Sequence, residues 1–287
     1  MLKTSLRVLS ACTCVLSLDQ ALASGFVDGS HADLTMRNYY FDRNYVNATP
    51  QAAAREWAQG FILNVRSGYT PGPVGFGLDA QGLLGVRLDS SRARTGTGLL
   101  PYSATTREPA DDYSELGLTA KVRASKSELQ LGTISTFLPI AFASPTRLLP
   151  QTFRGAYLKS QEIDKLTLHL GWLDRINLRD STDYQKMTVG SPNGRFNGAA
   201  ESDRFTFLGG DYAWSPQLTL KYYHAELADL YRKDFYGFVD NRPMGAGHLK
   251  SDFRLFVTGE DGAARAGPVD NRNAALMLSY SLGAHKF

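Results

Sequence analysis

Apolar and polar residues alternate along most of this chain with a period of two, which is typical of β-strands rather than of helices. The clearest case is residues 115–123. One side of this segment consists of Leu116, Leu118, Ala120 and Val122, and the other of Glu115, Gly117, Thr119, Lys121 and Arg123. Three of the five positions on the second side carry a charge. A water-filled barrel interior tolerates such a side, whereas a packed protein core does not.

The same rhythm predicts an all-β protein of about twelve antiparallel strands. The strands are expected at residues 32–43, 57–67, 74–88, 115–123, 128–132, 156–161, 166–174, 204–212, 218–226, 230–238, 249–258 and 273–282. After Ala23 no stretch approaches the 18 consecutive apolar residues that indicate a transmembrane helix. A membrane barrel stays compatible with the sequence, because its short alternating strands escape a hydropathy scan.

The first expected strand contains the segment Arg-Asn-Tyr-Tyr-Phe-Asp-Arg at residues 37–43. Its apolar side includes Leu34 and Met36, and its polar side includes Asp33 and Arg37. A buried guanidinium without partners is costly, so the two arginines of this segment need a wet surface. A channel lumen would supply that surface.

Two long connections interrupt the strands. Residues 90–112 are rich in Gly, Arg and Asp and show no period. Residues 133–155 contain three prolines, several apolar residues and two arginines, Arg147 and Arg154. Loops of this length are often functional. The apolar content of the second loop indicates that it packs against something, for example by folding into the lumen as a constriction.

Residues 1–23 have a basic start, an apolar run and the small-residue ending Ala-Leu-Ala, which is the pattern of a cleaved signal peptide. We therefore expect a mature β-barrel domain at residues 24–287. A lipoprotein processing box at residues 9–12 is the alternative, although it would leave almost no apolar signal core. Both cysteines, Cys12 and Cys14, lie in this leader, so the mature chain would form no disulfide.

Composition and motifs argue against several functions. The 31 Lys and Arg residues nearly balance the 28 Asp and Glu residues, so nucleic acid is not an expected partner. The five histidines lack metal-ligand spacing, and the glycines at residues 72–77 are flanked by prolines with no helix signal after them. No nucleophile elbow or carboxylate pair is recognisable. We expect no metal, no cofactor and no enzyme activity.

Motifs in order along the whole mature chain resemble the OprD family of outer-membrane substrate-specific porins of Gram-negative bacteria. They are Gly-Phe-Val-Asp at 25–28, Arg-Asn-Tyr-Tyr-Phe at 37–41, Glu-Trp-Ala-Gln-Gly-Phe at 56–61, Ser-Gly-Tyr-Thr at 67–70, Val-Gly-Phe-Gly at 74–77 with Leu-Leu-Gly at 83–85, Thr-Gly-Thr-Gly-Leu-Leu-Pro at 95–101, and Arg-Leu-Leu-Pro-Gln-Thr at 147–152.

The resemblance implies a transmembrane β-barrel with a narrow pore, an inward-folded loop and a ladder of basic side chains. Passive diffusion of small anionic or zwitterionic solutes, such as organic acids, amino acids or small peptides, is the implied function. The ladder or constriction residues would be Arg37, Arg43, Arg147, Arg154 and Arg179. Guanidinium groups keep their charge and offer forked donors to carboxylates. Ordinary surface pairing or loop solvation of these arginines is the alternative.

The implied partners are outer-membrane lipid and the barrel-assembly machinery, while assembly as a homotrimer stays open. Family members resemble 18-stranded barrels, so the roughly twelve strands expected here indicate a C-terminally truncated, incomplete barrel. Counting back by two from Phe287 gives the polar side of the last strand, the wrong phase for a terminal lipid-facing residue. A soluble secreted β-sandwich that binds or cleaves carbohydrate, and a non-functional porin fragment, are the alternative functions.

Overall fold

The computed structural model describes residues 25–46, 51–190, 194–283 and 285–286. The leader expected at residues 1–23 and the phase of Phe287 lie outside these ranges. The described part begins with a single helical turn at residues 25–28 and is otherwise made of strands and their connections. Among the helices of the described residues, none has the length and apolar character needed to cross a bilayer.

Fourteen strands of the described residues form one antiparallel sheet, in which each long strand pairs with the next long strand along the chain. The twelve long ones are β1 (His31–Asn44), β2 (Ala53–Arg66), β3 (Val74–Asp89), β4 (Asp112–Ala124), β5 (Ser127–Ile134), β6 (Thr152–Ser160), β7 (Leu166–Asn177), β11 (Phe205–Ala213), β12 (Leu218–Leu227), β13 (Tyr231–Met244), β14 (Gly247–Glu260) and β15 (Asp270–Leu282). The all-β fold and the expected number of strands are confirmed.

Four short strands complete the list. β8 (Tyr184–Gln185) pairs with β7, and β16 (His285–Lys286) pairs with β15. β9 (Met187–Thr188) and β10 (Glu201–Ser202) form a separate two-stranded sheet. The alternation of apolar and polar residues does not predict these short pairs.

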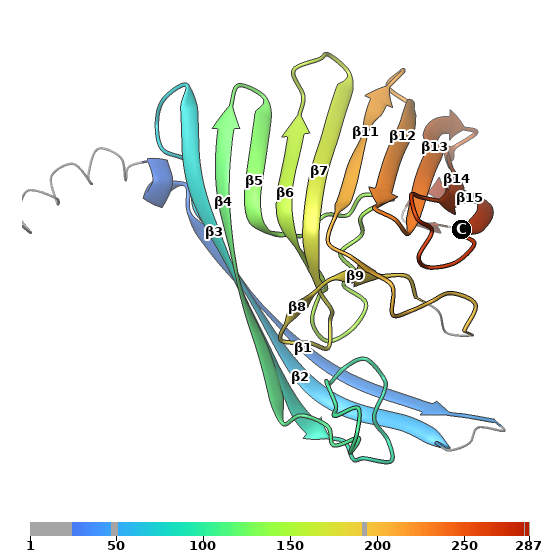
Figure 1. The fold of residues 1–287 in the computed structure, drawn as a ribbon. Coiled ribbons are helices and arrows are strands. Elements are labelled where there is room, and N and C mark those ends of the chain that lie inside the picture. Colours follow the sequence, from blue (N-terminus) through green and yellow to red (C-terminus); the bar gives the residue numbers. More distant parts are fainter. Residues whose placement is uncertain (1–24, 47–50, 191–193, 284, 287) are drawn as a thin grey trace, which may run out of the picture.

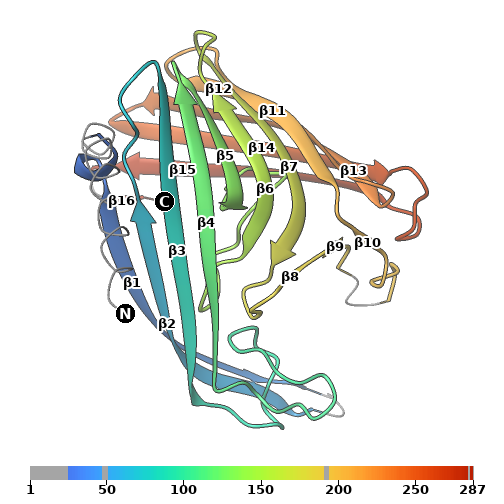
Figure 2. The same ribbon diagram turned by 60° about the vertical axis from the view of Figure 1, so that its left-hand side comes forward.

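The sheet is curved into part of a barrel wall, with short turns at the upper end of Figure 1 and the longer connections at the lower end. Figure 2 shows β2 to β7 side by side, with β14 and β15 running across behind them. Among the described strands, no pairing joins β1 to β15 or β16. The incomplete barrel expected from the sequence is therefore what the described residues form.

In a soluble protein the apolar face of a sheet is buried and the polar face is exposed, whereas in this sheet the apolar face is the exposed one. On β4, Leu116 and Leu118 are 74% and 52% exposed, whereas Lys121 on the other face is only 7% exposed. On β7, Leu170 and Trp172 are exposed while Leu173 is buried. An exposed apolar face and a covered polar face suit a wall between lipid and an aqueous lumen.

The loop between β5 and β6, residues 135–151, lies against the inner face of the wall. Its first half contributes Leu138, Ile140 and Ala141 to a buried cluster with side chains of β6, β7, β11, β12 and β13. Its second half contributes Leu148 and Leu149 to a different cluster with side chains of β2, β3 and β4. Because the two halves pack on two different parts of the wall, the loop crosses the space between them.

A pair of glycines marks the place where this loop leaves the sheet. Gly132 on β5 pairs with Gly155 on β6. Their φ angles of +120° and +156° are conformations that other residues rarely adopt. A Cβ atom on Gly132 would lie 2.2 Å from the carbonyl oxygen of Leu118. Glycine is therefore required here, and the distortion lets the chain turn inward.

Candidate pore constriction

Arg37 on β1 anchors the inward loop by hydrogen bonds to its main chain. Its Nη1 donates to the carbonyl oxygens of Pro145 at 3.0 Å and Leu148 at 3.3 Å, and also to that of Arg147. The partner of Arg37 across the β1–β2 ladder is Gly60, which leaves room for the side chain of Leu148. Carbonyl groups of a loop have no partners in the sheet and need other hydrogen-bond donors. The guanidinium of Arg37 donates to three of them.

Two further arginines share one aromatic ring. The guanidinium carbons of Arg43 and Arg147 each lie 5.2 Å from the centroid of the Phe41 ring. Phe41 lies on the inner face of β1 and packs against the cluster that holds Leu148 and Leu149. Cation–π contact at this range is attractive and fixes both guanidinium groups near the loop.

Arg147 and Arg179 meet at Gly98 in the connection between β3 and β4. A Cβ atom on Gly98 would lie 3.7 Å from Nε of Arg147 and 3.8 Å from Nε of Arg179. Arg147 Nε donates to the carbonyl oxygen of Thr97 at 3.1 Å, and Arg179 Nη1 donates to Oγ1 of Thr146 at 3.3 Å. Two separate loops thus bring their cationic side chains together beside a third, the β3–β4 connection.

Asp180 adds a carboxylate to this group of arginines. Its Oδ2 would lie 3.9 Å from a Cβ on Gly98. Burial raises the pKa of the Asp180 carboxyl above its ordinary value, and the nearby Arg179 and Arg147 oppose that rise only in part. The cluster is therefore mainly cationic, with one acid that titrates at a higher pH than an exposed aspartate.

A buried acid, Glu56 on β2, holds the β3–β4 connection in place. Its Oε2 accepts from the backbone N–H of Thr97 at 3.0 Å and from the Thr97 hydroxyl, and its Oε1 accepts from Ser90 Oγ at 3.1 Å. The Tyr113 hydroxyl lies 2.8 Å from the carbonyl oxygen of Leu99 and 3.1 Å from that of Arg179. These contacts position Gly98 beneath the arginines.

Arg154 has a different environment from the other predicted arginines. It lies on β6 and donates two hydrogen bonds to the carboxylate of Asp174, the one from Nε measuring 3.0 Å. Its guanidinium carbon also lies 5.9 Å from the ring centroid of Tyr184. The structure therefore groups Arg37, Arg43, Arg147 and Arg179 around the loop, and pairs Arg154 with an acid.

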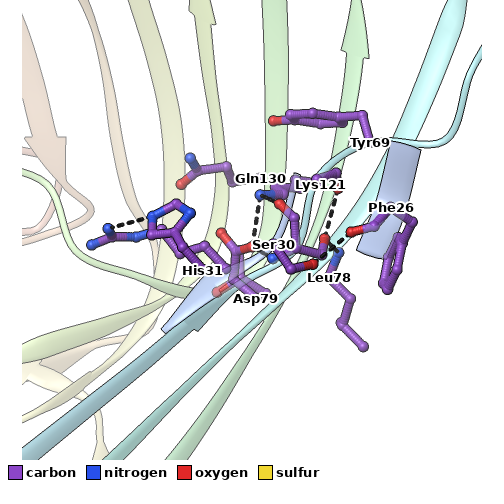
Figure 3. A network of polar contacts seen from close by, with 12 residues as sticks. Phe26, Ser30, His31, Tyr69, Leu78, Asp79, Lys121 and Gln130 are labelled. Carbon is purple, nitrogen blue, oxygen red and sulfur yellow. Dashed lines mark hydrogen bonds and ion pairs between the residues drawn. The ribbon is translucent and has the colours of Figure 1, made fainter. Parts of the chain in front are cut away.

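A second polar network lines the wall near the β2–β3 turn (Figure 3). Lys121 Nζ lies 2.7 Å from Asp79 Oδ1 and donates to the carbonyl oxygen of Ser67 at 2.8 Å. Lys121 Nζ also lies 4.8 Å from the ring centroid of Tyr69, whose hydroxyl donates to Glu128 at 2.5 Å. Here the cation is fully partnered, so this network ties the turn to the wall.

Sequence reasoning missed Glu56, Phe41 and Asp180. Glu56 had a usable signal, because an acid on the inner side of an alternating strand needs a partner. Phe41 is part of the family motif at residues 37–41, but the sequence does not show that arginine side chains contact its ring. Asp180 follows Arg179 in an irregular stretch, where sequence gives no information on burial. Within the described ranges, no group of three or more His, Cys, Asp or Glu side chains is arranged to hold a metal ion.

The profile of a family described as outer membrane porin, OprD family, matches residues 24–287. This match covers all of the described structure. The chain belongs to the OprD family of outer membrane porins.

Individual relatives agree with this assignment. The porin-like protein GalP of Pseudomonas putida is 39% identical over 269 residues, which are 93% of this chain and 64% of GalP. Porin D of Pseudomonas aeruginosa is 37% identical over 273 residues, which are 94% of this chain and 59% of Porin D. The crystal structure of Acinetobacter baumannii OccAB2 has a TM-score of 0.86 and 42% identity, covering 92% of this chain and 66% of that one.

These relatives are porins, which are channels rather than enzymes, and membership of the OprD family places the chain in the outer membrane of a Gram-negative bacterium. The chain spans less than two thirds of the length of both curated relatives. The soluble β-sandwich that the sequence left open needs two packed sheets. The long strands of the described part instead belong to one curved sheet.

Proposed function

We propose that this OprD-family chain forms part of a narrow pore for passive diffusion of small carboxylate-containing solutes, such as organic acids, amino acids or small peptides. One observation carries the proposal. Arg37, Arg43, Arg147 and Arg179 come from β1 and two separate loops and converge where the β5–β6 loop crosses the inner face. A cluster of fixed positive charges at a constriction attracts anions and repels cations.

The arginines retain donors for a passing solute. All the hydrogen bonds of Arg37 to the loop come from Nη1, so within the described residues its Nη2 and Nε are free to meet a carboxylate. Arg147 uses Nε and Nη1, which leaves Nη2. Each of these arginines thus keeps guanidinium N–H donors for a solute, and the cluster offers several weak binding positions rather than one tight site. Binding of this kind permits release, which conduction requires.

The exposed apolar face of the wall supports membrane lipid as a partner of the chain. Outer-membrane lipid would contact the exposed apolar face that includes Leu116 and Trp172. The barrel-assembly machinery as a folding partner, and a homotrimer as the final assembly, remain proposals taken from the family resemblance. Arg154 is proposed as a minor contributor, because Asp174 offsets its charge.

A planar bilayer experiment tests the proposal. The reversal potential in a potassium chloride gradient would be compared between the natural protein, the double variant Arg147→Gln with Arg179→Gln, and the control Arg92→Gln. Arg92 is exposed in the β3–β4 connection and pairs with Glu108, so the control removes a positive charge away from the cluster. We expect the double variant to lose most of its preference for chloride and the control to keep it. Equal preference in all three would refute the role of the cluster.

A second candidate, a fragment that does not conduct by itself, is supported by the two edges of the described sheet, where β1 has no partner on its outer side and β15 pairs only with the two-residue β16. Backbone groups at such an edge cost several kcal/mol each in hydrocarbon, on the order of the penalty for an unmade hydrogen bond. Bilayer recordings of residues 24–287, beside a full-length relative, separate the two candidates. Discrete current steps from the chain alone would exclude the fragment.

A further inference from the structure

Lys233 on β13 is an inner-face cation outside the arginine cluster. Its side chain is half-buried, and its Nζ lies 5.2 Å from the ring centroid of Tyr231. Among the described residues, no carboxylate lies within ion-pair distance of this nitrogen. Two other covered lysines of the inner face differ: Lys121 pairs with Asp79 at 2.7 Å, and Lys221 pairs with Asp211 at 2.6 Å. A covered cation without an anion is open to a ligand that brings one.

Lys233 borders a cavity of about 340 Å³ between the tip of the β5–β6 loop and the wall. Such a volume is within the range of small-molecule sites. The apolar lining includes Ile140 and Phe142 from the loop and Phe205 from β11, and the polar lining includes Gln151 and Gln185. Apolar walls with one cation and a few amides are the usual makeup of a site that orients an amphipathic ligand.

The loop tip that closes this cavity has a defined shape. The backbone N–H of Ala143 donates to Thr136 at 2.7 Å, and the backbones of Leu138 and Ala141 bond to each other, so residues 136–143 form a small hairpin. One side of the hairpin is buried in the cluster that contains Ile140. Phe142 is about half exposed and lies edge-on to Phe137, with ring centroids 5.6 Å apart. The apolar wall of the cavity is thus built on an ordered element.

The cavity is separate from the arginine cluster. Ile140 and Phe205 belong to the buried cluster formed with β6, β7, β11, β12 and β13. The arginines group instead beside Leu148 and Leu149, in the cluster formed with β2, β3 and β4. The crossing loop contributes to both places with different residues.

We propose that this cavity is a second anion site, which takes a small organic monoanion with a compact apolar body. The carboxylate lies at Lys233 Nζ in the cavity that Gln151 and Gln185 also line, and the apolar body lies against Ile140, Phe142 and Phe205. Binding here requires no conduction, so this site goes beyond the proposed transport function. A solute without an apolar body, such as acetate, gains little from the walls and binds weakly.

Lysine-methyl NMR tests the site directly. The full chain in detergent micelles is reductively methylated with ¹³C-formaldehyde, which preserves the lysine charges. Lys233→Met identifies the Lys233 resonance, and Lys233→Arg repeats this identification with the charge kept. We expect benzoate to shift this resonance saturably and acetate to bind at least about tenfold more weakly. The resonance of Lys126, in the exposed turn between β4 and β5, should not move.

Variants then separate charge from apolar contact. Phe142→Ala should weaken benzoate binding about tenfold and leave the response to acetate unchanged. Titration calorimetry should show a comparable loss for Lys233→Met, with Lys126→Met as the control of equal charge change. Equal affinities for benzoate and acetate, or equal shifts at Lys233 and Lys126, would overturn the proposal.

The arginine proposal and this one fail independently. Lys233 should respond to benzoate in the protein that carries both Arg147→Gln and Arg179→Gln. An anion-selective channel whose Lys233 resonance ignores benzoate would refute only the second site.

Discussion

The Nη1 atom of Arg37 in β1 donates to the carbonyl oxygen of Pro145, 3.0 Å away and 108 residues further along the chain. This contact joins the first strand of the wall to the loop that crosses its inner face. One side chain therefore has two roles, since it holds the loop and places a positive charge beside it. Its replacement should change both the width and the selectivity of the pore.

We expect Arg37→Ala to increase single-channel conductance and to lower stability by about 1–3 kcal/mol, because three loop carbonyls lose a charged donor. Bilayer recording and urea unfolding measure the two effects. Arg43→Ala removes the same charge from the same strand without releasing a carbonyl, so it should change selectivity with little effect on conductance. Equal conductance gains in both variants would contradict the anchoring role.

Glu56→Gln should destabilise the β3–β4 connection by about 1–2 kcal/mol. Both carboxylate oxygens accept hydrogen bonds in a fully buried place, and an amide nitrogen cannot accept. Urea unfolding followed by tryptophan fluorescence would measure the loss. Glu108→Gln is the matched control, because Glu108 is half exposed and its pair with Arg92 should contribute less than about 1 kcal/mol. A smaller loss for Glu56→Gln than for the control would refute this account.

Anion preference should rise as pH falls through the titration of Asp180. Burial raises the pKa of its carboxyl, so the acid gains a proton at a higher pH than an ordinary aspartate, and the cluster with Arg147 and Arg179 becomes more positive. Reversal potentials measured between about pH 7 and pH 4 would show the trend. Asp180→Asn should show, at every pH, the anion preference that the natural protein has at low pH, so its reversal potential should change less with pH.

The raised pKa of Asp180 also makes the stability of the folded protein depend on pH. Because the folded pKa of Asp180 lies above its unfolded value, its protonated form favours the folded state. This contribution is fully present below the unfolded pKa, near 4, and is lost as pH rises through the folded pKa. Asp180→Asn should therefore gain stability relative to the natural protein at neutral pH. A loss there would show that the ionised carboxylate is stabilising.

Gly132→Ala should prevent correct assembly of the wall around the β5–β6 loop. The added Cβ would lie 2.2 Å from a backbone oxygen of β4, at a φ of +120° that alanine rarely adopts. We expect a cost of about 3 kcal/mol or more, seen as loss of the folded, heat-modifiable band on gels. Gly198→Ala is the control, since nothing lies within 4 Å of its Cβ position. Normal folding of Gly132→Ala would show that this backbone can relax.

The strands of the wall were well predicted from the sequence. Alternate side chains of such a strand face lipid and lumen, so apolar and polar residues alternate along it. Residues 115–123 illustrate this, with Leu116 exposed outward and Lys121 covered inside. β2 nevertheless starts at Ala53, before the expected residue 57. The added residues include Ala54 and Glu56, which pack or bond on the inner side and carry no lipid-facing signal.

The candidate site was predictable only in part. Arg37, Arg43 and Arg147 were expected to line the pore from a family motif, but the sequence gives no sign that Arg37 bonds to loop carbonyls. Arg154 and Arg179 looked equivalent along the chain. A register shift between Arg154 and Gly155 accompanies the pairing of Arg154 with Asp174, whereas Arg179 follows the end of β7 and meets Arg147. Such differences depend on tertiary geometry, which local patterns do not encode.

The loop of residues 135–151 rests on two regions of the wall that are far apart in the sequence. Its second half rests on β2, β3 and β4, which precede it in the chain, and its first half rests on strands as late as β13. Neither region alone supports the whole loop, so the passage can reach its final width only in a wall in which all the strands from β2 to β13 are in place.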